Sequence, residues 1–139
     1  MPPTSTAPWP VLAQPMRGAP VEALQHLLRH HGAGIAADGE FGPQTDAAVR
    51  AFQQSHGLVV DGKAGPKTFA AIIVTVRRGD RGEAVRGAQC LCVDVTVDGI
   101  FGPKTEAGVK QMQGFLGLAT DGIVGPLTWR ALISGMLAG

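Results

Sequence analysis

The sequence predicts an all-α protein built from two tandem three-helix units, and three observations support this. The pattern Asp-Gly-x-x-Gly-Pro-x-Thr occurs four times, beginning at Asp38, Asp61, Asp98 and Asp121. Successive copies within a half are 23 residues apart and matching copies of the two halves are 60 apart, which indicates a duplication with a weaker echo inside each half. Apolar residues around the motifs recur at helical spacing, and alternation typical of strands has almost no support.

A first helix is predicted in each half by apolar residues at positions i, i+3 and i+7. These are Val21, Leu24 and Leu28 in the first half and Val85, Ala88 and Cys92 in the second. Upstream of the motifs the halves align with a different shift, because Arg17 matches Arg81, 64 residues later, instead of 60. The first half therefore carries about four extra residues, which we place in 30–34.

The second and third helices each begin at the proline of a motif, since proline is favoured in the first turn of a helix. Pro43 and Pro103 begin the second helices, and Pro66 and Pro126 begin the third ones. The helical faces that follow are Ala48, Val49 and Phe52; Val109, Met112 and Phe115; Phe69 and Ile72; and Trp129 and Leu132. Their spacing predicts that Phe69 and Trp129 are core residues and not an exposed platform for stacking sugars.

Each motif is interpreted as a turn that leads into a helix. Glycine after the aspartate can adopt positive φ, the aspartate can accept backbone N–H bonds, and the threonine can bond the aspartate or the loop. We therefore predict a structural role for the whole motif. Its residues are Asp38, Gly39, Gly42, Pro43, Thr45, Asp61, Gly62, Gly65, Pro66, Thr68, Asp98, Gly99, Gly102, Pro103, Thr105, Asp121, Gly122, Gly125, Pro126 and Thr128.

Length, charge and hydropathy limit the function classes. A net charge of +1, from 12 basic and 11 acidic side chains, does not supply the cationic surface of a nucleic-acid binder. The apolar runs are far shorter than the roughly 20 residues of a membrane-spanning helix, so no membrane span is predicted. The Pro-rich start has neither a basic segment nor a continuous apolar stretch, so no secretory signal is predicted.

The repeat suggests a flexible leader over residues 1–10, a first domain over 11–74 and a second over 75–139. The connection over 73–78 is short and partly apolar, so we expect the two units to lie close together. Phe115 and Leu116 stand where the first half has Ser55 and His56, which suggests a contact with the other repeat or with 135–139.

The sequence offers little support for metal, phosphate or catalytic sites. Calcium is disfavoured because the loop that starts at Asp94 has Thr105 at its twelfth position. His26 and His30 lack a third zinc ligand and are expected at the surface. The Gly-Pro step removes a donor that phosphate would need, and no Ser-His-Asp or Cys-His set is apparent. We therefore predict no metal, no cofactor and no enzyme activity, with the cysteines as free thiols.

Residues 36–72 and 97–132 together resemble two copies of the type-one peptidoglycan-binding domain family. The motifs occur in order with the Phe52-Gln53 or Met112-Gln113 pair and the Gly57-Leu58 or Gly117-Leu118 step. These family modules are three-helix units attached to bacterial wall hydrolases, amidases and carboxypeptidases. The resemblance implies non-catalytic peptidoglycan binding, through the glycan strand, the stem peptide or both, and a location at the cell wall or outside the cell.

Peptidoglycan carries amides and carboxylates, so its binder needs amide donors, cations and small residues that permit close approach. Candidate contacts are Arg50, Gln53, Lys63, Lys67, Lys110 and Gln113. An alternative function stays open, in which the same helices contact protein, as a propeptide-like cap or as a component of a wall-penetrating particle.

Overall fold

The computed structural model describes residues 9–138, with side chains as far as Gly135, and confirms the all-α class. Within that range no strand forms, and the chain folds into six helices. They are α1 (Ala19–His30), α2 (Pro43–Ser55), α3 (Pro66–Ile72), α4 (Glu83–Cys90), α5 (Pro103–Phe115) and α6 (Pro126–Ala138). Each motif proline is the first residue of its helix, as predicted.

Isolated backbone bridges tie the segment before each first helix to the motif turns, and they confirm the register of the duplication. The four pairs are Leu12 with Ala64, Arg17 with Glu40, Val76 with Val124, and Arg81 with Ile100. The upstream partners differ by 64 residues and the motif partners by 60. The structure thus repeats the same contacts across the two shifts that the sequence shows.

The extra residues of the first repeat lengthen its first helix and the loop after it. Helix α1 has 12 residues and α4 has 8, a difference of one helical turn. In the second repeat the chain leaves the helix at Leu91 and turns at once towards the motif. In the first repeat it continues to His30 and then forms the loop 31–35.

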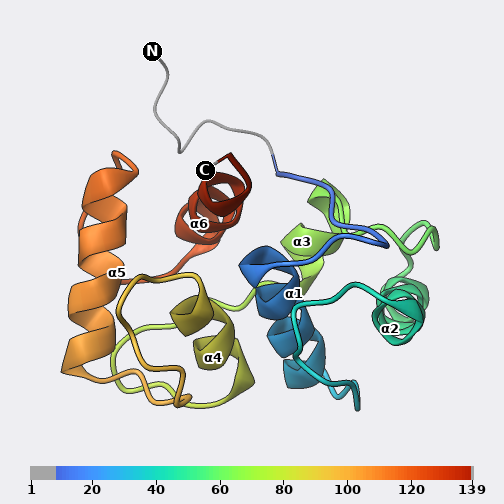
Figure 1. Cartoon of the computed structure of the whole chain (residues 1–139), viewed down its shortest axis with the longest axis horizontal. Coiled ribbons are helices and arrows are strands. Elements are labelled where there is room, and N and C mark those ends of the chain that lie inside the picture. The colour runs from blue at the N-terminus through green and yellow to red at the C-terminus, as the bar shows by residue number, and fades with distance from the viewer. Residues whose placement is uncertain (1–8, 139) are drawn as a thin grey trace.

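The two repeats pack through their first helices. Figure 1 shows α1 and α4 side by side in the centre of the molecule, with α2 and α5 on opposite flanks. Helix α1 also contacts α2 and α6. A Cβ added at Gly87 of α4 would lie 3.2 Å from the carbonyl oxygen of Ala23 and 3.4 Å from Trp129, so this position leaves no room for a larger residue.

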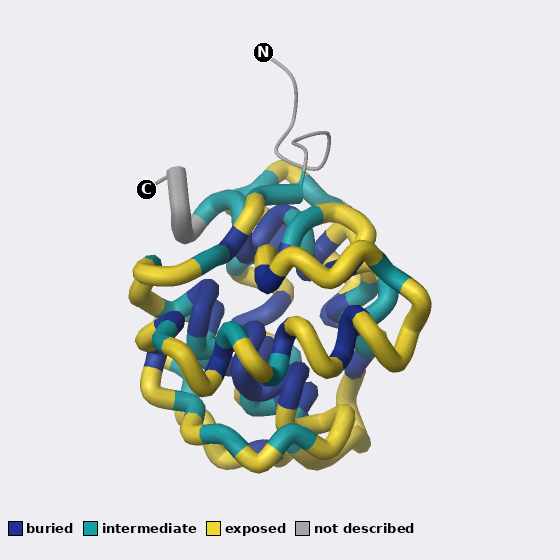
Figure 2. The backbone as a smooth tube through the Cα atoms, turned by 90° about the vertical axis from the view of Figure 1, so that its right-hand side faces the viewer, coloured by how far each residue is buried: buried dark blue, intermediate teal, exposed yellow. Residues whose placement is uncertain are grey.

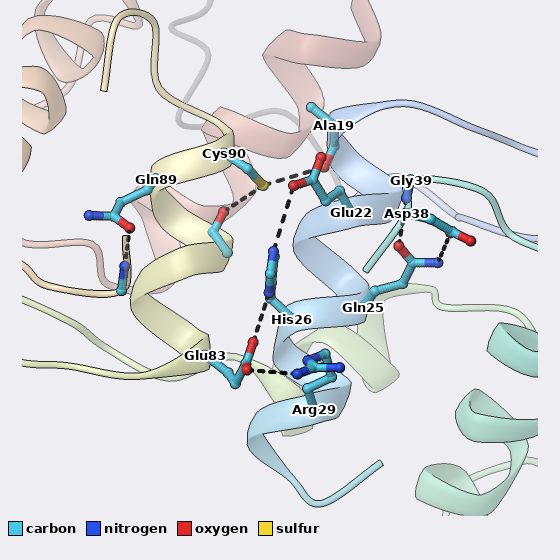
Figure 3. Close-up of polar contacts among 12 residues, drawn as sticks. Ala19, Glu22, Gln25, His26, Arg29, Asp38, Gly39, Glu83, Gln89 and Cys90 are labelled. Atoms are coloured by element: carbon cyan, nitrogen blue, oxygen red, sulfur yellow. Dashed lines mark hydrogen bonds and ion pairs between the residues drawn. The ribbon is translucent and has the colours of Figure 1, made fainter. Parts of the chain in front are cut away.

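Polar contacts across this interface come from equivalent positions of the two helices but differ in chemistry. His26 is buried and its Nδ1 lies 2.8 Å from Oε1 of Glu83, whereas we expected it at the surface. Arg29 Nη2 lies 3.2 Å from Oε2 of the same carboxylate (Figure 3). The reciprocal contact, at positions 64 residues further on, is the Cys90 thiol 3.8 Å from the Ala19 carbonyl oxygen.

The predicted core residues are confirmed, and buried segments lie inside the shell of exposed loops in Figure 2. Phe69 and Trp129 are both fully buried. The indole Nε1 of Trp129 donates to the Val74 carbonyl oxygen at 2.8 Å. Residues 1–8 of the predicted leader lie outside the described residues, while Trp9 stacks on Phe69 with ring centroids 4.8 Å apart.

The extra apolar pair of the second repeat separates into two environments. A Cβ on Gly135 of α6 would lie 3.1 Å from Leu116, so Leu116 faces the end of α6, as expected. Phe115 instead remains 76% exposed and does not meet the other repeat. Both cysteines are free thiols, as predicted.

Candidate functional site

A buried glutamine organises each of the four motif turns. Gln25 serves the turn at Asp38 and Gln89 the turn at Asp98. The two downstream turns use Gln53 with Asp61 and Gln113 with Asp121. We call each glutamine, with its Asp-Gly turn and the motif threonine, a glutamine cluster.

The first cluster shows how the side chain is used (Figure 3). Gln25 Nε2 donates to Oδ1 of Asp38 and to the Glu40 carbonyl oxygen, both at 3.0 Å, and to Oγ1 of Thr45 at 2.9 Å. Its Oε1 accepts from the backbone N–H of Gly39 at 2.8 Å. One amide thus satisfies the polar groups of an entire turn.

The other three clusters repeat this geometry, and all four glutamines are at most 1% exposed. In each, the glutamine amide reaches the aspartate carboxylate and the threonine hydroxyl within 3.2 Å. The threonine hydroxyls in three of the clusters also approach a loop carbonyl oxygen, and none of the four bonds the aspartate. The second-position glycines all adopt positive φ, between 73° and 77°.

The aspartates also accept a hydrogen bond from their own turn. Asp38 Oδ1 accepts from the backbone N–H of Glu40 at 2.9 Å, and the other three motifs repeat this bond. This N–H is the main reason that the pKa of each aspartate lies below its ordinary value of 3.8, and the glutamine amide adds to it.

The six candidate contact residues do not gather in one place. Gln53 and Gln113 are buried, and their amides bind the turns. Arg50 pairs with Asp46 at 2.6 Å, and its Nη2 lies 3.3 Å from the Asp61 carbonyl oxygen. Three candidates keep exposed side chains without belonging to a cluster. They are Lys63, Lys67 and Lys110.

The largest hollow of the described surface lies elsewhere, between the loop 31–35 and α2. It is a groove of about 590 Å³, and we call it the α2 groove. None of the six candidates lines it. Its lining residues are Leu28, His31, Gly32, Ala33, Gly34, Ile35, Gln44, Ala47, Ala48, Ala51, Phe52, Ser55 and His56.

One end of the α2 groove is aromatic. The ring of His56 stacks on Phe52, with centroids 4.0 Å apart and planes 24° apart. His56 Nδ1 lies 3.0 Å from the Phe52 carbonyl oxygen, so it donates there, and this bond fixes the ring. His31 meets Phe52 edge to face at 5.1 Å and donates from Nε2 to the Ile72 carbonyl oxygen at 3.0 Å.

The rest of the α2 groove combines small residues with a polar amide. Ala47, Ala48 and Ala51 form the α2 side, and Gly32 and Gly34 lie in the facing loop. Gln44 is exposed and lines the groove. Sequence analysis did not single out this site, although the extra residues with two glycines were its visible sign.

The second repeat closes the equivalent space. Val95 lies on α5 at Gly108, where a Cβ would overlap with the valine side chain. The matching positions in the first repeat, 60 residues earlier, are Ile35 and Ala48, and both line the α2 groove. A second, more apolar hollow of about 330 Å³ lies by the Asp121 turn.

Other site types find little support in the part of the chain that the structure describes. No group of three or more histidine, cysteine, aspartate or glutamate residues there could hold a metal ion. Among the helices within 9–138, none is long and apolar enough to cross a membrane.

Two small helical units that repeat one polar cluster define a tandem module of the all-α class. The chain belongs to the family described as "Putative peptidoglycan binding domain", whose model matches residues 17–72 and 86–132. Both repeats are therefore matched, and the predicted family and its peptidoglycan-binding function are confirmed.

Similar proteins include two named wall enzymes. The chain is 58% identical over 65 residues to a zinc D-Ala-D-Ala carboxypeptidase of Streptomyces albus G, covering 42% of this chain and 26% of that protein. It is 29% identical over 110 residues to a probable N-acetylmuramoyl-L-alanine amidase of Bacillus licheniformis, covering 73% of this chain and 31% of that protein. The chain thus spans less than a third of these two relatives.

Among solved structures, the SleB N-terminal domain is 39% identical. That match covers 45% of this chain and 88% of the solved one, with a TM-score of 0.44.

Proposed function

We propose that this chain attaches to peptidoglycan without cleaving it and holds a wall enzyme or a larger assembly at the bacterial cell wall. The observation that carries the proposal is the family match over both repeats. The names of the carboxypeptidase and amidase relatives support a wall hydrolase as the partner, on the same or a separate chain. A location at the cell wall or outside the cell follows from this function.

Attachment without cleavage is tested by sedimentation with insoluble peptidoglycan. The full chain is incubated with purified wall, the pellet is assayed for protein, and the supernatant is assayed for released muropeptides by mass spectrometry. We expect the chain in the pellet and no release above buffer. Release of muropeptides would show catalysis, and absence of the chain from the pellet would remove the proposed function.

The exposed lysines are proposed to contact stem-peptide carboxylates. Lys63 and Lys67 flank the Asp61 motif turn, and Lys110 lies beside the Asp121 turn, where its Cε is 3.2 Å from the place of a Cβ on Gly122. Reversing Lys63 and Lys67 to glutamate should weaken retention on wall and reduce its salt dependence. Lys104→Glu, another exposed change, serves as a control of equal charge per site.

A second candidate function is protein assembly, and exposed apolar residues of the second repeat favour it. Phe115 is 76% exposed and Val93 is 61% exposed. In that case a Phe115→Ser variant would lose assembly with a protein partner while wall retention stays unchanged. Failure of the wild-type chain to sediment with wall would favour this candidate over peptidoglycan binding.

A further inference from the structure

The α2 groove has the composition of a binding site for a neutral ligand. Its lining residues all lie within the described range, and none of them is lysine, arginine, aspartate or glutamate. A free carboxylate is usually matched in proteins by arginine or lysine, which form charge-assisted hydrogen bonds. The free carboxylates of a stem peptide would find no such partner here.

The groove does offer an aromatic face and an amide. His56 is exposed, and the Phe52 ring against which it stacks lies beneath one of its faces. Because Nδ1 of His56 donates to the Phe52 carbonyl oxygen, the ring cannot rotate freely. A pyranose presents one face of C–H groups, which packs on such a ring, so His56 is a preformed platform for a sugar.

The remaining surface matches an acetamido group. Such a group has one N–H donor, one carbonyl acceptor and a methyl, and its polar atoms need partners when they leave water. The Gln44 side-chain amide supplies both a donor and an acceptor. Ala47 and Ala51 lie one turn apart on α2 and leave space for the methyl group between small side chains.

We propose that the α2 groove binds the N-acetylated sugar strand of peptidoglycan, with a sugar ring on His56 and an acetamido group at Gln44. This rests on the proposed function and assigns the glycan, not the stem peptide, to this groove. It also assigns the site to the first repeat, because Val95 fills the corresponding space of the second.

The test uses the full chain and two soluble probes. Triacetylchitotriose carries the sugar ring and the acetamido group without any peptide, and an N-acetylated Lys-D-Ala-D-Ala peptide carries the carboxylate without sugar. Each is titrated to about 10 mM, which detects dissociation constants near 1 mM, while backbone amide NMR signals are recorded. We expect the chitotriose, and not the peptide, to shift signals of residues 31–35 and 44–56.

Variants of exposed residues locate the contact. Gln44→Ala and His56→Ala should each weaken chitotriose binding at least about tenfold, the effect of one good polar or stacking contact. Lys104→Ala, at the position that matches Gln44 in the second repeat, should change nothing. Unchanged amide signals elsewhere in each variant verify that it is folded.

Three results would overturn the assignment and each is distinct from failure of the proposed function. Peptide binding in the α2 groove would make the stem peptide its ligand. Chitotriose shifts confined to α5 would move the site to the second repeat. Absence of both probes' binding, with the chain still sedimenting with wall, would leave peptidoglycan binding intact and exclude the groove. Loss of sedimentation by the wild-type chain would instead refute the proposed function.

Discussion

The first repeat holds an open groove beside its second helix, and the second repeat fills the same place with a valine. Both repeats use the same glutamine clusters and the same helix starts, so their frames are alike. What differs is the segment between the first helix and the turn, longer by four residues in the first repeat. A duplicated fold can therefore keep its polar framework while one copy gains a site and the other gains packing.

The largest effect should come from the part that the repeats share. Gln53→Leu and Gln113→Leu each leave a buried threonine hydroxyl and a backbone N–H without partners, which should reduce the free energy of unfolding by about 3 kcal/mol. Gln54→Leu, at an exposed position, should cost little. Urea denaturation followed by circular dichroism measures all three. A loss below about 1 kcal/mol at Gln113 would mean that the two frames are not equivalent.

Gly108 and Val95 test the packing of the second repeat. Gly108→Ala forces a methyl into the valine side chain and should destabilise the chain by about 2 kcal/mol. Adding Val95→Ala should remove most of that cost, because the overlap disappears. A double-mutant cycle from thermal unfolding measures the coupling between the two changes. Additive effects would show that Val95 does not occupy the space over Gly108.

Acid should weaken both repeats alike through the motif aspartates. Their folded-state pKa values lie below 3.8, so protons bind more readily to the unfolded chain. Their stabilising contribution is fully present above about pH 5 and is lost as the pH falls through the lowered folded-state values. Asp38→Asn and Asp98→Asn should flatten the decline of unfolding midpoint below pH 4 to a similar degree. A decline in only one of them would break the equivalence.

The smallest effect concerns the interface between α1 and α4, where Cys90 takes the place that His26 has in the first repeat. Burial raises the pKa of the Cys90 thiol well above its usual range and that of Cys92 to about 11, so little thiolate is present at neutral pH. Iodoacetamide at pH 8 should label both slowly in the folded chain and rapidly in urea, as mass spectrometry would show. Fast labelling of Cys90 in the folded chain would indicate that the helices separate.

The fold could be predicted because each helix start is encoded locally. A glycine and a proline at fixed places, followed by apolar residues at helical spacing, suffice for Pro43 and Pro103 alike. The two long-range partners of the motif were harder. Gln25 lies 13 residues before its aspartate, and Gln53 lies 8 residues before its own. Because a helix end and a loop separate them, no constant spacing shows that the glutamines are buried, and two of them were interpreted as ligand contacts.

The groove was less accessible to sequence reasoning. Gly32 and Gly34 marked a longer loop, but whether such a loop packs on α2 or stands away from it depends on side-chain volume at two distant positions. Ala48 and Gly108 differ by one methyl, and this difference accompanies an open groove in one repeat and a filled one in the other. His26 was also misplaced, since its burial depends on a helix that begins more than fifty residues later.

The glutamine clusters use only the backbone of the third motif residue. At Glu40, Lys63, Ile100 and Ile123 the amide and carbonyl groups are bonded, and the side chains take no part in the cluster. The next residue in every copy, by contrast, is a buried apolar one. The fold thus offers four surface addresses whose chemistry is decoupled from its architecture, and the acid, base and two isoleucines found there show that selection can decorate each one separately.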